Sequence, residues 1–119
     1  MTTLVNVKVK YLRPQYQNLR SWMADGNNVY IGRRGRVFID GELFTFEGSE
    51  WGNPFTLKNT PREECIENYK LYLLDKLQDE ATLNRFMLLQ GKTIGCWCRT
   101  NDGNYSCHGN VIIDILNQI

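Results

Sequence analysis

The C-terminal stretch from Thr93 to Ile119 constrains the fold most, because it holds a strand and a helix that must pack together. The apolar residues around Ile94 predict a short buried strand that ends in Cys96-Trp97-Cys98. After a polar loop, apolar residues recur at helical spacing and predict an amphipathic helix with Val111, Ile112, Ile115, Leu116 and Ile119 buried. We therefore expect an α/β fold with a site at this strand-to-helix junction.

Composition limits the classes of protein that this chain can belong to. A chain of 119 residues with 42% hydrophobic residues has the size and core of one globular domain, residues 1–119. Lys+Arg 14 against Asp+Glu 13 argues against a general nucleic-acid coat but leaves room for a local basic patch. No signal peptide and no bilayer-spanning apolar run are visible, so we expect an intracellular protein that is not secreted and has no membrane partner. In a reducing compartment, the four cysteines favour thiols or metal ligands over disulfides.

The first third of the chain predicts a strand, a helix and a second strand. Val5, Val7 and Val9 alternate with polar residues, which is typical of a strand with one buried face. Leu19, Trp22 and Met23 give a short helix one apolar side, and residues 29–31 form a second apolar strand. We expect these to form one right-handed crossover unit within a mixed, mainly parallel sheet with flanking helices.

Residues 36–50 predict a β-hairpin inserted into this fold. Asp40-Gly41 tolerates positive φ at both positions of a tight turn, and apolar runs flank the turn. The hairpin carries three phenylalanines, so we expect it to fold over the core or to contact a second subunit in a homodimer.

Two helices are expected after the hairpin. Thr60, Pro61 and Glu63 form a capping box for the first, whose expected inward residues are Ile66, Tyr69, Leu73, Leu74 and Leu77. Cys65 lies beside that stripe and is interpreted as a small core residue. The second runs from about Thr82 to Gln90, with Leu83, Phe86, Met87 and Leu89 as its apolar residues.

A basic turn, Gly32-Arg33-Arg34-Gly35-Arg36, follows directly on the second strand. Loops beyond the carboxyl ends of strands bind ligands in open α/β sheets, and arginines there can bind phosphate or carboxylate with two hydrogen bonds. A plain solvated turn has the same composition, so this alternative stays open.

Three interpretations compete for the cysteines and the histidine near the C-terminus. Cys96, Cys98, Cys107 and His108 could form a Cys3His zinc site, although Cys-x-Cys and adjacent Cys-His are poorer ligand spacings than Cys-x-x-Cys. Alternatively, Cys107 at the start of the helix is a catalytic nucleophile with His108 as its base. Buried cysteines beside a capped helix need no chemistry at all.

The residues resemble domain of unknown function family 4326, which occurs in phages and large DNA viruses. The resemblance is carried by Val29-Tyr30-Ile31-Gly32-Arg33, Trp51-Gly52-Asn53-Pro54-Phe55, Arg62, Tyr69, Gly91-Lys92, Gly95-Cys96-Trp97-Cys98 and Cys107-His108-Gly109. It implies a viral or phage protein that acts inside an infected cell or is packaged in the particle. Asn110 stands where the family usually has Asp, and the hairpin over 36–50 looks like an insertion.

Two functional hypotheses follow. In one, the protein is a self-associating viral accessory or virion-associated module whose cysteine cluster stabilises the fold, with or without zinc. In the other, a pocket binds a phosphate-bearing ligand such as a nucleotide or a nucleic-acid end, through Tyr30, Arg33, Asn53, Arg62 and Asn110. The sequence favours the first hypothesis slightly, because no intact acid–base pair is visible.

Overall fold

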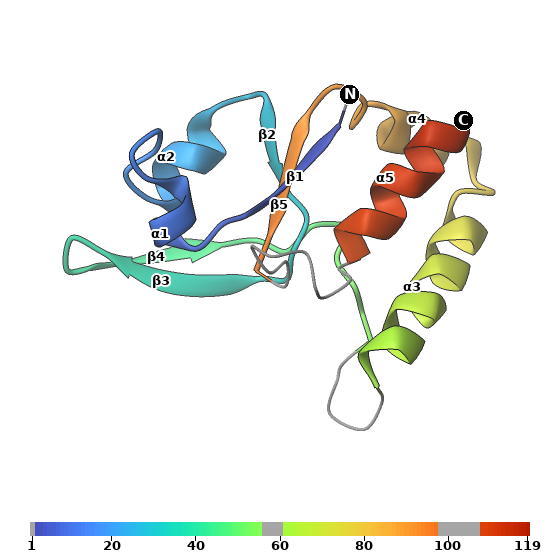
Figure 1. The fold of residues 1–119 in the computed structure, drawn as a ribbon, viewed down its shortest axis with the longest axis horizontal. Coiled ribbons are helices and arrows are strands. Elements are labelled where there is room, and N and C mark those ends of the chain that lie inside the picture. The colour runs from blue at the N-terminus through green and yellow to red at the C-terminus, as the bar shows by residue number, and fades with distance from the viewer. Residues whose placement is uncertain (1, 56–60, 98–107) are drawn as a thin grey trace.

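The computed structural model describes residues 2–55, 61–97 and 108–119, which form an α/β fold with two sheets (Figure 1). Three parallel strands form one sheet in the order β1-β5-β2, and two antiparallel strands form the other. In chain order the elements are β1 (Thr3–Asn6), α1 (Val9–Leu12), α2 (Leu19–Ala24), β2 (Asn28–Tyr30), β3 (Gly35–Ile39), β4 (Glu42–Phe46), α3 (Arg62–Lys76), α4 (Glu80–Met87), β5 (Thr93–Cys96) and α5 (His108–Gln118).

Strand β5 occupies the centre of the parallel sheet. The predicted strand–helix–strand unit has parallel strands, but β1 and β2 are not neighbours, because each pairs with β5 instead. Ile94, Gly95 and Cys96 are all buried, and a strand buried on both faces belongs in the middle of a parallel sheet.

Helices cover both faces of this sheet, as Figure 1 shows. On one face, Leu4 and Ile94 belong to a core built with α3, α4 and α5. On the other face, Val7, Trp22 and Tyr30 form a second core beside α1 and α2. Because both faces of the sheet are covered, residues on either face of β5 are buried.

The predicted alternation through Val9 was wrong at its end. Strand β1 stops at Asn6, whose side-chain Oδ1 accepts a hydrogen bond from the Lys8 amide at 2.9 Å. This local bond turns the chain, since a short polar side chain competes with the ladder for backbone groups. Val9 consequently opens α1 and is 44% exposed.

The hairpin was predicted correctly. Asp40 has φ 52° and Gly41 has φ 82°, so both turn residues are left-handed, as a tight antiparallel turn requires. Phe46 is buried in the second core, with its ring edge-to-face against Tyr30 at 5.2 Å between centroids. Phe38 on β3 is 76% exposed, so the hairpin is anchored at its base and leaves an aromatic side chain in solvent.

Helices α2, α3, α4 and α5 lie close to their predicted positions, whereas α1 covers residues that start in the predicted strand. Three residues expected on the apolar faces of these helices are exposed. The burial expected of Leu74, Met87 and Ile119 was wrong, because these residues are 43%, 39% and 53% exposed. In α3 the buried stripe follows i, i+4 spacing from Cys65 through Tyr69 to Leu73, which leaves Leu74 beyond its edge. Thr60, the expected helix cap, lies outside the described residues.

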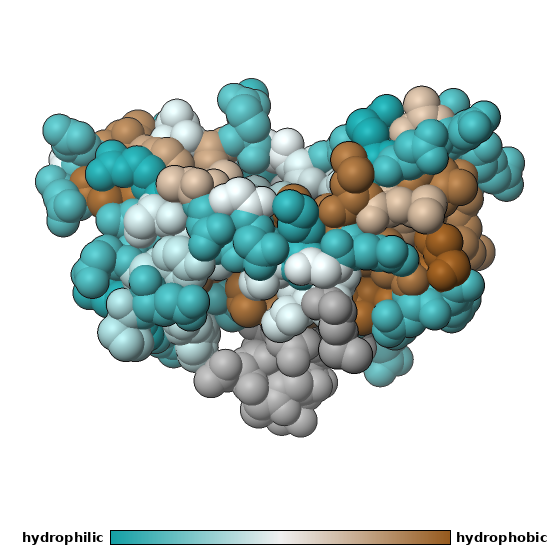
Figure 2. Space-filling view, turned by 90° about the horizontal axis from the view of Figure 1, so that it is seen from above, coloured by the Kyte–Doolittle hydropathy of each residue, from teal (hydrophilic) through white to brown (hydrophobic). Residues whose placement is uncertain are grey.

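Apolar surface remains on the half of the molecule that carries α3, α4 and α5, where hydrophobic side chains gather on the right of Figure 2. None of the helices in the described part of the chain combines the length and apolar character needed to cross a membrane.

Candidate functional site

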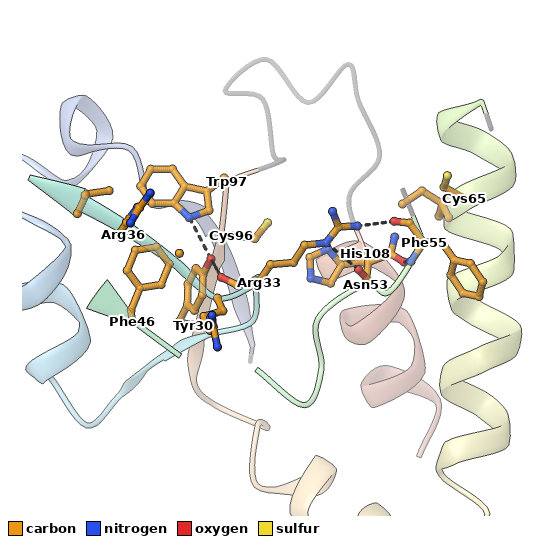
Figure 3. Close-up of a pocket in the computed structure, with 15 residues that line it drawn as sticks. Tyr30, Arg33, Arg36, Phe46, Asn53, Phe55, Cys65, Cys96, Trp97 and His108 are labelled. Carbon is orange, nitrogen blue, oxygen red and sulfur yellow. Dashed lines mark hydrogen bonds between the residues drawn. The ribbon is translucent and has the colours of Figure 1, made fainter. Parts of the chain in front are cut away.

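A pocket of about 660 Å³ lies beyond the carboxyl ends of β2 and β5 (Figure 3). These strands run parallel and end at Tyr30 and Cys96, so their ends meet at one edge of the sheet, where α5 also begins. This edge is where open α/β sheets bind ligands. The described residues that line the pocket are Tyr30, Gly32, Arg33, Arg34, Gly35, Arg36, Val37, Phe46, Asn53, Phe55, Cys65, Ile66, Cys96, Trp97 and His108.

The charge of the lining is one-sided. Arg33, Arg34 and Arg36 all line the pocket, and the described lining residues include no Asp or Glu. The only ion pair within the described ranges joins Arg85 to Glu50, so no described acid neutralises these three guanidinium groups. Like charges gathered at a concave surface raise the local concentration of anions, so the pocket favours an anionic ligand.

Arg33 also has a structural role. Its Nε donates a hydrogen bond to the Asn53 carbonyl at 3.0 Å, and its Nη2 donates one to the Phe55 carbonyl. The Asn53 side chain in turn accepts a hydrogen bond from the Phe55 amide at 2.9 Å, which shapes the same segment. Arg33 therefore clamps the basic turn to residues 53–55. Among the described residues, neither Arg34 nor Arg36 makes a side-chain hydrogen bond or ion pair that would compete with a ligand.

An aromatic wall faces the arginines. The Trp97 indole Nε1 donates to the Tyr30 hydroxyl at 3.0 Å, and that hydroxyl donates to the Arg33 carbonyl at 2.7 Å. Phe46 packs against both residues, with its centroid 5.2 Å from that of Tyr30 and 6.3 Å from that of Trp97. One hydroxyl therefore connects the end of β5, the end of β2 and the basic turn.

His108 reaches the same pocket from the first turn of α5. The imidazole is buried at 5% exposure, with Nε2 2.8 Å from the Ile31 carbonyl oxygen. A carbonyl oxygen only accepts, so Nε2 carries a proton, and any role as base or metal ligand falls to Nδ1. The ring also packs edge-to-face on Tyr69 at 5.2 Å.

Two members of the predicted zinc set lie at the pocket, since Cys96 and His108 both line it. Cys98 and Cys107 lie outside the described residues. Cys107 is also the predicted thiol nucleophile, so that hypothesis falls outside the described residues as well. In the part of the chain that the structure describes, no three His, Cys, Asp or Glu side chains are grouped as metal ligands. The zinc and thiol hypotheses therefore stay predictions.

The structure brings together Tyr30, Arg33 and Asn53 of the predicted ligand set. Arg62 opens α3, but its side chain lies outside what the structure describes. Asn110, half-buried in α5, is not among the described lining residues. Sequence reasoning missed Phe46, Phe55, Trp97 and Cys65 as lining residues. The available hints were that Phe55 follows a proline and that Trp97 lies between two cysteines at the end of a strand.

Comparisons with known proteins agree with the family resemblance. Residues 15–118 match a family model described as Domain of unknown function (DUF4326). The chain is 34% identical over 98 residues to "Uncharacterized protein R718" of Acanthamoeba polyphaga mimivirus, which covers 77% of this chain and 68% of the viral protein. No solved structure matches the chain significantly. The chain belongs to the family of the Domain of unknown function (DUF4326).

Proposed function

We propose that the protein binds a nucleotide or a closely related phosphate-bearing ligand in the pocket at the carboxyl ends of β2 and β5. The supporting observation is the lining: three arginines, four aromatic side chains and no described carboxylate surround about 660 Å³. This volume suits a small-molecule ligand. Guanidinium groups match phosphate oxygens with paired hydrogen bonds, and aromatic rings provide faces or edges for a planar base.

The lining residues suggest which groups would hold the ligand. Arg34 and Arg36 would hold the phosphate, because Arg33 already binds the carbonyl groups of Asn53 and Phe55. The base would pack toward Trp97, which is half-buried and so retains exposed ring surface.

Calorimetric titration and thermal unfolding with a nucleoside monophosphate, a nucleoside triphosphate, inorganic phosphate and an uncharged nucleoside test this proposal. Ligand at about 100 times Kd should stabilise the protein by about 2.7 kcal/mol. The double substitution Arg34→Ala with Arg36→Ala should abolish that gain, while Lys70→Ala removes a charge from exposed α3 surface and should not. Equal binding of the uncharged nucleoside, or no response to any phosphate compound at millimolar concentration, contradicts the proposal.

A self-associating accessory role, inside the infected cell or in the virion, is the second candidate. It is supported by Phe38 and Leu43, which are directly paired across the hairpin and are 76% and 50% exposed. An exposed apolar cross-strand pair on a two-stranded sheet is typical of a contact surface. Sedimentation at about 1 μM should show a dimer, which Phe38→Ser should dissociate. If the unsubstituted protein is still a monomer at 100 times that concentration, the self-associating role is ruled out.

A further inference from the structure

A second hollow of about 390 Å³ adjoins the proposed nucleotide pocket. Val37 and Trp97 line both cavities. Along β3, residues 35–37 face the first cavity and residues 37–40 line the second, so the two follow each other along this strand. We call the two neighbouring cavities together the β3 groove, with Val37 and Trp97 at their shared boundary.

The second half of the β3 groove repeats the chemistry of the first. Lys8 and Arg13 line it, and the exposed ring of Phe38 lies at its wall. Arg13 Nε donates a hydrogen bond to the Gln17 carbonyl at 2.9 Å, so a phosphate would bind its terminal Nη groups. Asp40 is the one acid among the described residues that line either cavity. Five cationic side chains thus face one carboxylate, although the whole chain carries a net charge of only +1.

Aromatic side chains accompany the cations along the whole groove. Trp97 separates the two cavities, with Phe46 behind it on the first side and Phe38 on the second. Alternation of cations with aromatic rings along a track is the pattern of proteins that bind single-stranded nucleic acid, in which phosphates pair with cations and bases stack on rings. A mononucleotide would leave Lys8 and Arg13 without a phosphate to bind.

We infer that the ligand class of this site is a single strand of nucleic acid that lies along β3, and this inference rests on the proposed nucleotide pocket. The five residues of β3 extend over about 15 Å, at about 3.3 Å per residue. At about 3.4 Å per nucleotide of stacked strand, the β3 groove holds about four nucleotides. Double-stranded nucleic acid does not fit this role, because its stacked bases cannot reach the half-buried ring of Trp97.

The test measures Kd for thymidine monophosphate and for oligothymidylates of increasing length, with oligouridylates in parallel. Affinity should rise from one to about four nucleotides and then level off. For the four-nucleotide strand, the negative slope of log K against log salt should become shallower by about 0.7 when a single cation that binds phosphate is removed. Lys8→Ala and Arg13→Ala should each show this change, and Lys70→Ala, on exposed α3 surface, should not.

The outcomes separate this inference from the proposed function. If thymidine monophosphate binds but longer strands bind no tighter, and Lys8→Ala and Arg13→Ala leave the salt slope unchanged, the inference is overturned and the nucleotide pocket stands. If neither the monophosphate nor any strand binds, both are overturned. A poly-glutamate peptide that competes as well as the four-nucleotide strand would show a general polyanion groove and also overturn the inference.

Discussion

The Tyr30 hydroxyl should be the structural centre of the candidate site, and Tyr30→Phe tests this with the smallest available change. The hydroxyl accepts from the Trp97 indole at 3.0 Å and donates to the Arg33 carbonyl at 2.7 Å. Phenylalanine keeps the ring, including its edge-to-face contact with Phe46. The substitution therefore removes both of these hydrogen bonds and leaves an indole N–H and a carbonyl group without this partner.

The size of the effect follows from these two bonds. Each contributes about 0.5 to 1.5 kcal/mol net, so Tyr30→Phe should lower the free energy of unfolding by about 1 to 3 kcal/mol. A chain of 119 residues unfolds with an entropy of about 0.25 kcal/mol/K, so each kcal/mol lowers Tm by about 4 °C. The expected change in Tm is about 4 to 12 °C. Nucleotide affinity should fall as well, because the basic turn loses its tie to the two strand ends.

Urea titration and thermal unfolding of Tyr30→Phe measure the change, with Tyr11→Phe as the matched control. Tyr11 lies on α1 at 36% exposure, and no hydrogen bond to its hydroxyl is found among the described residues. If Tyr30→Phe unfolds within about 1 °C of Tyr11→Phe, which corresponds to about 0.25 kcal/mol, the hydroxyl does not organise the site. That result would refute the argument from the hydrogen bonds.

Three further predictions concern the fold. Gly95→Ala should destabilise the protein by about 2 kcal/mol in urea titration, because the new Cβ would lie 2.6 Å from the Trp22 ring; an unchanged midpoint would contradict the tight packing of β5. Gly41→Ala should cost about 1 kcal/mol through its φ of 82° alone, since no atom lies within 4 Å of the new Cβ, and a neutral result would argue against this turn. The hydrogen bond from the Thr82 hydroxyl, and then that from its amide, hold the pKa of Asp79 below 3.8. The carboxylate therefore stabilises the fold above pH 3.8, and this contribution is lost as pH falls through the lower pKa of the folded state. Asp79→Asn lacks this contribution at every pH. Its Tm should therefore fall less between pH 7 and pH 2 than that of the unsubstituted protein.

Local patterns were enough to predict most of the elements, with α1 as the exception. The Asp40-Gly41 turn needs two residues that accept positive φ, and such a preference is a property of the dipeptide itself. The same holds for the apolar spacing of Trp22 in α2 and of Ile112 in α5, which are both buried. Where local signals compete, the pattern failed: the side chain of Asn6 ends β1 before the alternation ends.

The sequence by itself determined an α/β chain with a hairpin, a basic turn after one strand and a cysteine–histidine segment after another. Only the tertiary structure decided that β5 lies between β1 and β2, which brings the ends of β2 and β5 to one pocket. The contacts that build the pocket join residues far apart in the chain, with Trp97 bound to Tyr30 across 67 positions and His108 bound to Ile31 across 77. Residue patterns record each segment's own preference for helix, strand or turn, whereas strand order and pocket shape come from the packing of all segments together.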